Sequence, residues 1–343
     1  MTGRDRPWAA LGGLCLAGAL LLVLVDARAA LGGWLSGFVL CSAVPLGALL
    51  LIMMMYLIPG SWRAELLPVA LDMQWLLPAA AVAVLPVIVA SPVLYPWAAE
   101  VIGGWRGLYL TVEGFALRTG LFFLGAMALS FALASRPGVT SALSAAGLIG
   151  FVVADTTVVV DWLMSLAAHF HSSGFGLYVL SIQATVALAV LLIARLWATR
   201  SDRMNLLGGL LLTSLLLWAY LAFMQFFIVW SDNLSEGARW YLRRAEGGWA
   251  VVEWIMAASQ LVPTLLLFLA PVRRGRVWLI ALSAIVVAGK ALEVAWLVAP
   301  ETGNPAILGM AFAATTAGLV LVAPAAAALT QGLLRRPVAR VLP

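Results

Sequence analysis

Long apolar runs alternate with short polar connections along the whole chain. Ten of the runs are long enough for a helix to cross a bilayer, which takes about 20 mostly apolar residues. The predicted limits are 8–25, 34–58, 73–97, 112–134, 140–164, 173–197, 204–230, 249–270, 277–299 and 305–333. Because the connections are short, we expect neighbouring helices to be antiparallel.

The composition leads to the same class of protein. Hydrophobic residues make up 64% of the chain and charged residues 10%, which is more apolar surface than a soluble core can bury. The chain is therefore predicted to be an all-α integral membrane protein with a single polytopic domain in the lipid bilayer. The formal net charge of +5 does not indicate nucleic-acid binding, because the arginines are spread over many short connections.

The arginines predict the orientation, because cytoplasmic loops carry an excess of Lys and Arg. With ten spans, both termini lie on one face. Of the arginines outside the spans, the opposite face receives only Arg28, Arg106, Arg239, Arg243 and Arg244. We therefore expect a multi-pass protein of the bacterial cytoplasmic (inner) membrane with both termini cytoplasmic.

Two similar stretches hint at an internal repeat. Ala142-Leu143-Ser144-Ala145 precedes Gly150 and Asp155, and Ala281-Leu282-Ser283-Ala284 precedes Gly289 and Glu293. We interpret them as parts of two related four-helix bundles, over 34–164 and 173–299. The first helix (8–25) and the last helix (305–333) would flank the bundles. Such short patterns also recur by chance, so the repeat stays a hypothesis.

The thiols and imidazoles argue against a bound cofactor. Cys15 and Cys41 both lie in apolar runs and lack metal-ligand spacing, and iron–sulfur clusters need several thiolates. The only two histidines, His169 and His171, lie in one connection, whereas a haem within the membrane needs histidine ligands inside helices. No metal site and no cofactor bound by this chain are predicted.

Ionisable and polar residues within the spans are candidates for a proton pathway, since charge is costly in a bilayer. The candidates are Asp72, Glu113, Arg118, Asp155, Asp161, His169, Gln183, Tyr220, Gln225, Glu253, Lys290 and Glu293. For each of these, a structural hydrogen bond or ion pair is the alternative. Lys290 and Glu293 are three residues apart and should share a helix face.

Several of these candidates carry specific expectations. Asp155 is expected either to carry a proton or to bond a neighbouring helix, and it is the expected partner of Arg118. Glu253 is expected to share the polar interior of Lys290. Asp72 is expected to open the third span, as the mouth of a channel or as a helix N-cap.

Two stretches resemble one protein family. In the first, Asp161, Trp162, Met164, Ser165, Leu166, His169, Ser172, Phe175 and Gly176 match the pattern Asp-Trp-x-Met-Ser-Leu-acidic-Pro-His-Trp-x-Ser-Thr-x-Phe-Gly. The second runs from Leu217 to Phe226 and continues through 230–234, 240–244 and 247–249. Together they resemble the "quinone-binding subunit 2" of bacterial alternative complex III, a quinol:cytochrome c oxidoreductase whose membrane subunits are related to those of polysulphide-reductase-type enzymes. The acidic-Pro pair of the family is Ala167-Ala168 here, so an acidic relay beside His169 is missing.

The resemblance implies a subunit without a redox centre of its own. Its partners would be the iron–sulfur, haem c and quinol-site membrane subunits and a terminal cytochrome oxidase, with quinone bound at the level of the complex. Proton translocation or support of a quinone site is the expected role. The alternatives are a stand-alone secondary transporter and a structural or docking subunit. For docking, Asp232, Trp240, Tyr241 and Arg243 are the candidate contacts.

Overall fold

The computed structural model describes residues 6–99, 104–135, 140–167, 170–231 and 235–338. Every element in these ranges is a helix, and ten helices are long and apolar enough to span a membrane. The predicted class and the predicted number of spans are confirmed. The spans are Arg6–Leu24, Ala27–Leu57, Ser61–Val89, Val112–Ser135, Ser141–Leu166, Phe175–Ala198, Met204–Ser231, Gly248–Leu267, Arg276–Thr302 and Pro305–Leu333.

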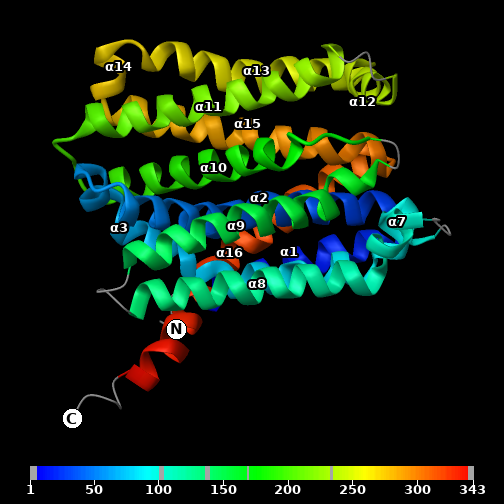
Figure 1. Ribbon diagram of the computed structural model, residues 1–343, viewed down its shortest axis with the longest axis horizontal. Coiled ribbons are helices and arrows are strands. Elements are labelled where there is room, and N and C mark those ends of the chain that lie inside the picture. Colours follow the sequence, from blue (N-terminus) through cyan, green and yellow to red (C-terminus); the bar gives the residue numbers. More distant parts are fainter. Residues whose placement is uncertain (1–5, 100–103, 136–139, 168–169, 232–234, 339–343) are drawn as a thin grey trace.

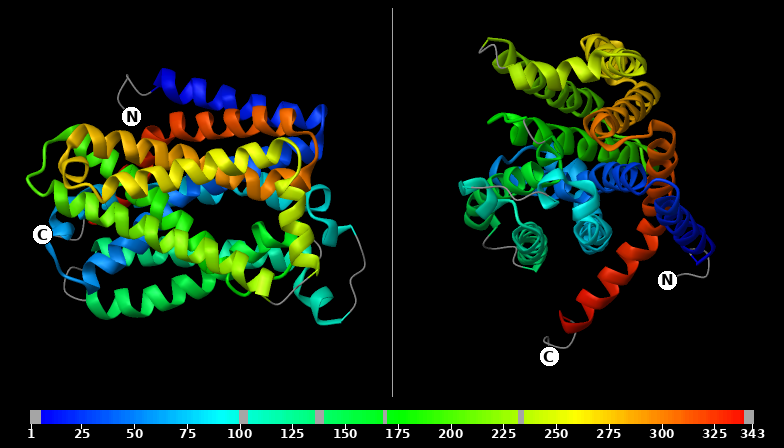
Figure 2. Two further views of the ribbon diagram at one scale, coloured as in Figure 1. Left: turned by 90° about the horizontal axis from the view of Figure 1, so that it is seen from above. Right: turned by 90° about the vertical axis from the view of Figure 1, so that its right-hand side faces the viewer.

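The helices run side by side, and their connections alternate between two ends (Figure 1). The α14 end carries α14 (Ala270–Arg274) and the start of α3 (Ser61–Met73). The α12 end carries α7 (Gly104–Tyr109) and α12 (Ser235–Ala245). The first helix, α1 (Arg6–Leu21, extended by η1, Leu22–Leu24), begins at the α14 end, and the last, α16 (Pro305–Val338), ends there (Figure 2).

We name two groups of four spans by their order in the chain, and α2 of the first group also contacts α10 and α15 of the second. In the first group, α2 (Ala27–Leu57) contacts the third span, α8 (Val112–Ser135) and α9 (Thr140–Trp162, followed by η4, Met164–Leu166). In the second, α10 (Phe175–Ala198) and α15 (Arg276–Thr302) contact each other, and α11 (Met204–Ser231) and α13 (Gly248–Leu267) complete the group. α1 and α16 pack together and against α2.

Helix α2 lies at the centre because its small residues let other helices approach closely. A Cβ added to Gly33 would lie 2.4 Å from the Leu308 carbonyl oxygen of α16. A Cβ added to Gly47 would lie 2.4 Å from the Gln183 carbonyl oxygen of α10. Glycine at these two positions thus brings the first group into contact with both α16 and α10.

The third span differs from the prediction, because it begins at Ser61 rather than at residue 73. Arg63, Glu65 and Asp72 lower the hydropathy of its first turns, but Glu65 forms an ion pair of 2.8 Å with Arg195. Prolines then divide the span into short pieces, since each removes a backbone hydrogen-bond donor. The pieces after α3 are η2 (Gln74–Leu76), α4 (Leu77–Ala83) and α5 (Leu85–Val89), and α6 (Ser91–Leu94) and η3 (Pro96–Ala98) follow the span.

Candidate functional site

A buried ion pair lies inside the second group of helices. Lys290 and Glu293 are three residues apart on α15, and their side chains are 0% exposed. The Lys290 ammonium donates a hydrogen bond of 2.7 Å to Glu293 Oε2. The prediction that these two residues share a face is confirmed. A fully buried charge needs such a partner, because the bilayer offers no water to solvate it.

Two aromatic residues from other helices complete this pair. Trp218 of α11 donates its indole N–H to Glu293 Oε1 at 2.8 Å, and the Tyr178 hydroxyl of α10 donates to the same oxygen. The Lys290 ammonium also lies 3.4 Å from the centre of the Trp218 ring, a cation–π contact. Three helices therefore converge on one carboxylate. The sequence did not single out Tyr178 or Trp218, because nothing in one helix indicates which neighbour it faces.

Polar side chains from α13 reach α15 one residue before the pair. A Cβ added to Gly289 would lie 1.8 Å from Ser259 Oγ and 2.2 Å from Gln260 Nε2, so only glycine permits this approach. The Gln260 amide donates to the Val286 carbonyl oxygen at 3.1 Å. Gln260 Oε1 and the buried Ser283 hydroxyl have no hydrogen-bond partner among the described residues. Buried polar atoms are rarely left unpaired, so Gln260 and Ser283 are two unsatisfied polar groups on the α14 side of the pair.

On the other side of the pair, an aromatic cluster closes the α12 end. We use this name for Phe170, Phe175, Trp240 and Trp296. The rings of Phe170 and Trp240 stack at 4.4 Å, and Trp240 meets Trp296 edge-on at 5.4 Å. The Arg244 guanidinium lies 3.6 Å above the Trp240 ring. This part of α12 therefore packs into the protein and separates the buried pair from the surface.

Arg244 is held by several acceptors although its side chain is buried. It pairs with Glu301 at 3.1 Å and donates to the Leu297 carbonyl oxygen at 2.8 Å. Burial lowers the pKa of Arg244 to about 10, and Glu301 opposes that effect. Arg244 therefore stays charged at neutral pH. Burial also raises the pKa of the neighbouring Tyr241, with a smaller opposing effect of Arg244 and a further rise from Glu253.

These positions change the interpretation of α12 as a docking element. Trp240 is 4% exposed and packs within this chain, so the prediction that it contacts a partner is wrong. An amphipathic helix turns its large aromatic residue inward. Arg243 is 52% exposed and pairs with Glu301 at 3.1 Å, and Tyr241 is half-buried. Asp232, the remaining docking candidate, lies outside the described residues.

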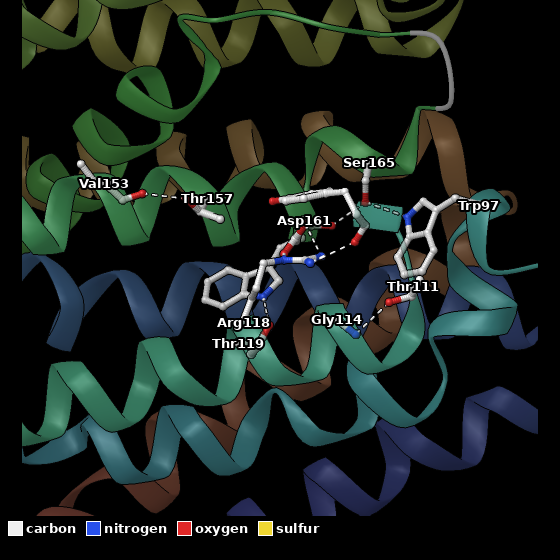
Figure 3. Close-up of polar contacts among 11 residues, drawn as sticks. Trp97, Thr111, Gly114, Arg118, Thr119, Val153, Thr157, Asp161 and Ser165 are labelled. Atoms are coloured by element: carbon white, nitrogen blue, oxygen red, sulfur yellow. Dashed lines mark hydrogen bonds and ion pairs between the residues drawn. The ribbon is translucent and has the colours of Figure 1, made fainter. Parts of the chain in front are cut away.

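The first group of helices holds a different ion pair near its α12 end (Figure 3). Arg118 of α8 binds both carboxylate oxygens of Asp161, at 2.7 and 3.1 Å. It also donates to the Tyr109 carbonyl oxygen at 2.9 Å and lies 3.9 Å from the Tyr109 ring centre. The expectation that Arg118 pairs with Asp155 is therefore wrong. Asp155 lies six residues earlier on α9 and faces α10 instead.

The groups around this ion pair are well provided with hydrogen bonds. Trp162 donates to Thr119 at 3.1 Å, and Trp97 donates to Ser165 at 3.0 Å (Figure 3). Burial raises the pKa of Tyr109 to about 12, with a further contribution from Asp161, so this phenol stays neutral. A bidentate pair within satisfied neighbours is a fixed structural contact.

Asp155 is fully buried between the two groups of helices. Its Oδ1 accepts a hydrogen bond of 3.0 Å from the Gln183 amide of α10, so the expected bond to a neighbouring helix is present. Asp155 Oδ2 and Gln183 Oε1 have no hydrogen-bond partner in the part of the chain that the structure describes. Unlike Asp161, this carboxyl group has no cation on the described part of the chain within ion-pairing distance.

Three candidates turn away from the polar interior. Asp72 is exposed and lies in the last turn of α3, so the predicted N-cap is wrong, since the helix continues through it. Glu113 is exposed in the first turn of α8. Tyr220 is 58% exposed on α11, which excludes it from an internal polar path. The sequence does not reveal these orientations, because hydropathy is nearly uniform around such helices.

The remaining candidates have other settings. Gln225 accepts a hydrogen bond of 2.7 Å from Ser172, away from the buried pair. Glu253 is half-buried on α13 and lies close enough to Tyr241 to affect its pKa. His169 lies outside the described residues. Within the described ranges, no group of three or more His, Cys, Asp or Glu side chains is placed to hold a metal ion.

Comparison of the chain with models of known protein families and with curated proteins finds no match.

Proposed function

We propose that the protein is a proton-conducting membrane subunit of a respiratory quinol:cytochrome c oxidoreductase and carries no redox centre itself. The observation that supports this most is the Lys290–Glu293 pair, buried at 0% exposure within an apolar bundle. Ionisable side chains at such depth are expensive and usually mark ion or proton pathways. The resemblance of the 161–176 and 217–249 stretches supports the choice of complex.

The pair allows a proton to move from Lys290 to Glu293 at constant net charge. When Lys290 gives a proton to Glu293, an ammonium–carboxylate pair becomes an amine and a carboxylic acid, and the net charge stays zero. The Nζ–Oε2 distance of 2.7 Å is suited to this transfer. Trp218 and Tyr178 hold the acceptor carboxylate in place throughout.

Under the orientation that the arginines predict, the α14 end is cytoplasmic. Protons would then reach Lys290 from the cytoplasmic side along Ser283 and Gln260, whose Oγ and Oε1 atoms have no hydrogen-bond partner among the described residues. Glu293 would release them on the Tyr178 side, toward α12, past the aromatic cluster that separates the pair from the surface. The Arg118–Asp161 pair in the first bundle is assigned a structural role, because its geometry is fixed on all sides.

The proposal is tested in the assembled complex by measuring protons moved per electron transferred. Lys290→Met and Glu293→Gln remove one member of the pair each, and both are expected to lower this ratio. Tyr220→Phe is the matched control, since it removes a polar atom from an exposed position on α11. An unchanged ratio in both pair variants at normal assembly would refute proton conduction by this subunit.

One observation favours a second role, as a docking subunit for a terminal cytochrome oxidase. Arg239 and Arg243 are exposed on α12, at the end that the orientation rule places outside. Charge removal at both positions would then reduce assembly of the larger complex and leave the proton-to-electron ratio unchanged. A lower proton-to-electron ratio with normal assembly of the larger complex would contradict this role.

A further inference from the structure

Asp155 is a buried carboxyl group that belongs to no ion pair of the described residues. It is 0% exposed, and it lies 14 residues after the start of its span at Ser141 and 11 residues before the end at Leu166. At about 1.5 Å per residue, these stretches measure about 21 and 17 Å, whereas half of the hydrocarbon core is about 15 Å thick. The carboxyl group therefore lies near the middle of the membrane.

The helices packed against α9 bring no cation to this carboxyl group. Their titratable residues are Arg28, Cys41 and Tyr56 on α2, Glu113 and Arg118 on α8, and Tyr178 and Arg195 on α10. Arg118 and Arg195 are bound to other carboxylates in ion pairs. Arg28 lies 19 residues before Gly47, the point at which α2 meets Gln183, which is about 28 Å along a helix.

An ionised carboxylate at this place would be an uncompensated charge. Taking an ion out of water costs several kcal/mol unless a partner compensates it, and a buried carboxylate without a partner takes up a proton instead. Asp161 and Glu293 each have a cation at 2.7 Å. Asp155 has none within ion-pairing distance on the described part of the chain, so burial favours its neutral form.

The contact with Gln183 has the chemistry that suits a carboxylic acid. The Gln183 amide donates to Asp155 Oδ1 at 3.0 Å. The other oxygen of each side chain is buried and has no hydrogen-bond partner among the described residues. A carboxylate has no hydrogen to donate, so both of these oxygens would remain acceptors without a donor. A carboxylic acid adds one O–H donor, and Gln183 Oε1 is the matching free acceptor.

We propose that Asp155 binds one proton and, as a carboxylic acid, joins α9 to α10 through two hydrogen bonds with Gln183. The bond from the Gln183 amide to Oδ1 is present in the structure, and the bond from Oδ2–H to Gln183 Oε1 forms when the proton is bound. Because α9 belongs to the first group of helices and α10 to the second, the proton links the two groups. Loss of the proton would weaken their contact. The site is separate from the Lys290–Glu293 pair and does not depend on the proposed function.

The test is infrared spectroscopy of the full chain, purified and reconstituted in lipid, at neutral pH. A protonated carboxyl group has a C=O stretching band that a carboxylate lacks. Asp155→Asn should fold, because its amide offers the same acceptor and donor as a carboxylic acid, and it should lose this band. Asp72→Asn is the matched control, since Asp72 is exposed, and it should leave the band unchanged.

A second variant tests the partner. Gln183→Leu removes both hydrogen bonds and keeps the carboxyl group. The band of Asp155 should therefore remain and move to higher frequency, because hydrogen bonding lowers the stretching frequency of a C=O group. Gln183→Met, which keeps the unbranched shape, serves if Gln183→Leu does not fold.

Two results would overturn the proposal. If Asp155→Asn has the same acid band as the wild type, Asp155 is ionised. If the band is lost in Asp155→Asn but keeps its frequency in the folded Gln183 variant, the acid is not bonded to Gln183. Neither result involves the proton-to-electron ratio of the complex, so a failure here is distinct from a failure of the proposed function.

Discussion

The buried pair in the second bundle can be tested by a double-mutant cycle. In Lys290→Met, Glu293 keeps its two neutral donors, Trp218 and Tyr178. The free energy of unfolding should therefore fall by about 3 kcal/mol, the lower end of the range for a broken buried pair. In Glu293→Gln, the ammonium keeps the face of Trp218 and has a neutral amide oxygen in place of the carboxylate. This loss should be near the upper end, about 5 kcal/mol.

The double variant should be more stable than either single variant, because it leaves no unpaired charge in the bundle. Its free energy of unfolding is expected to fall by less than about 3 kcal/mol, whereas the losses of the two single variants add up to about 8 kcal/mol. The difference is a coupling energy of about 5 kcal/mol or more. Equilibrium unfolding in mixed detergent micelles, followed by helical circular dichroism, measures all four free energies. A double variant that loses the full sum would refute the interpretation of Lys290 and Glu293 as one compensated pair.

Three further predictions concern a helix contact, an ion pair and the aromatic cluster. Gly47→Ala should separate α2 from α10 and lower the free energy of unfolding by about 1–3 kcal/mol. Gly120→Ala is the control and should leave this free energy unchanged, because a Cβ at Gly120 meets nothing within 4 Å. Equal losses for both variants in the same unfolding assay would contradict the close contact at Gly47. Arg118→Met leaves Asp161 buried without a cation, and should cost about 3–5 kcal/mol; a loss below about 1 kcal/mol would show that the pair contributes little. Trp240→Ala should remove the centre of the aromatic cluster and make α12 sensitive to added protease, and an unchanged cleavage rate would show that α12 is held elsewhere.

Much of the site lay beyond prediction because hydropathy is read along one helix, whereas partners come from several. The i, i+3 spacing indicated that Lys290 and Glu293 meet, since helix geometry alone fixes that contact. The partner of Arg118 depended on how α8 and α9 rotate against each other, and the rotation selects Asp161. Tyr178 and Trp218 were missed for the same reason.

The sequence by itself determined the class of the protein, the number of its spans and most of their limits, because the length of an apolar run sets whether a helix can cross a bilayer. The predicted start of the third span was twelve residues too late, because Arg63, Glu65 and Asp72 are charged residues typical of a loop. The sequence does not reveal that Arg195 pairs with Glu65. Only the tertiary structure decided which polar side chains face inward. That choice is made by close contacts between helices at small residues such as Gly47 and Gly289, which hydropathy does not register.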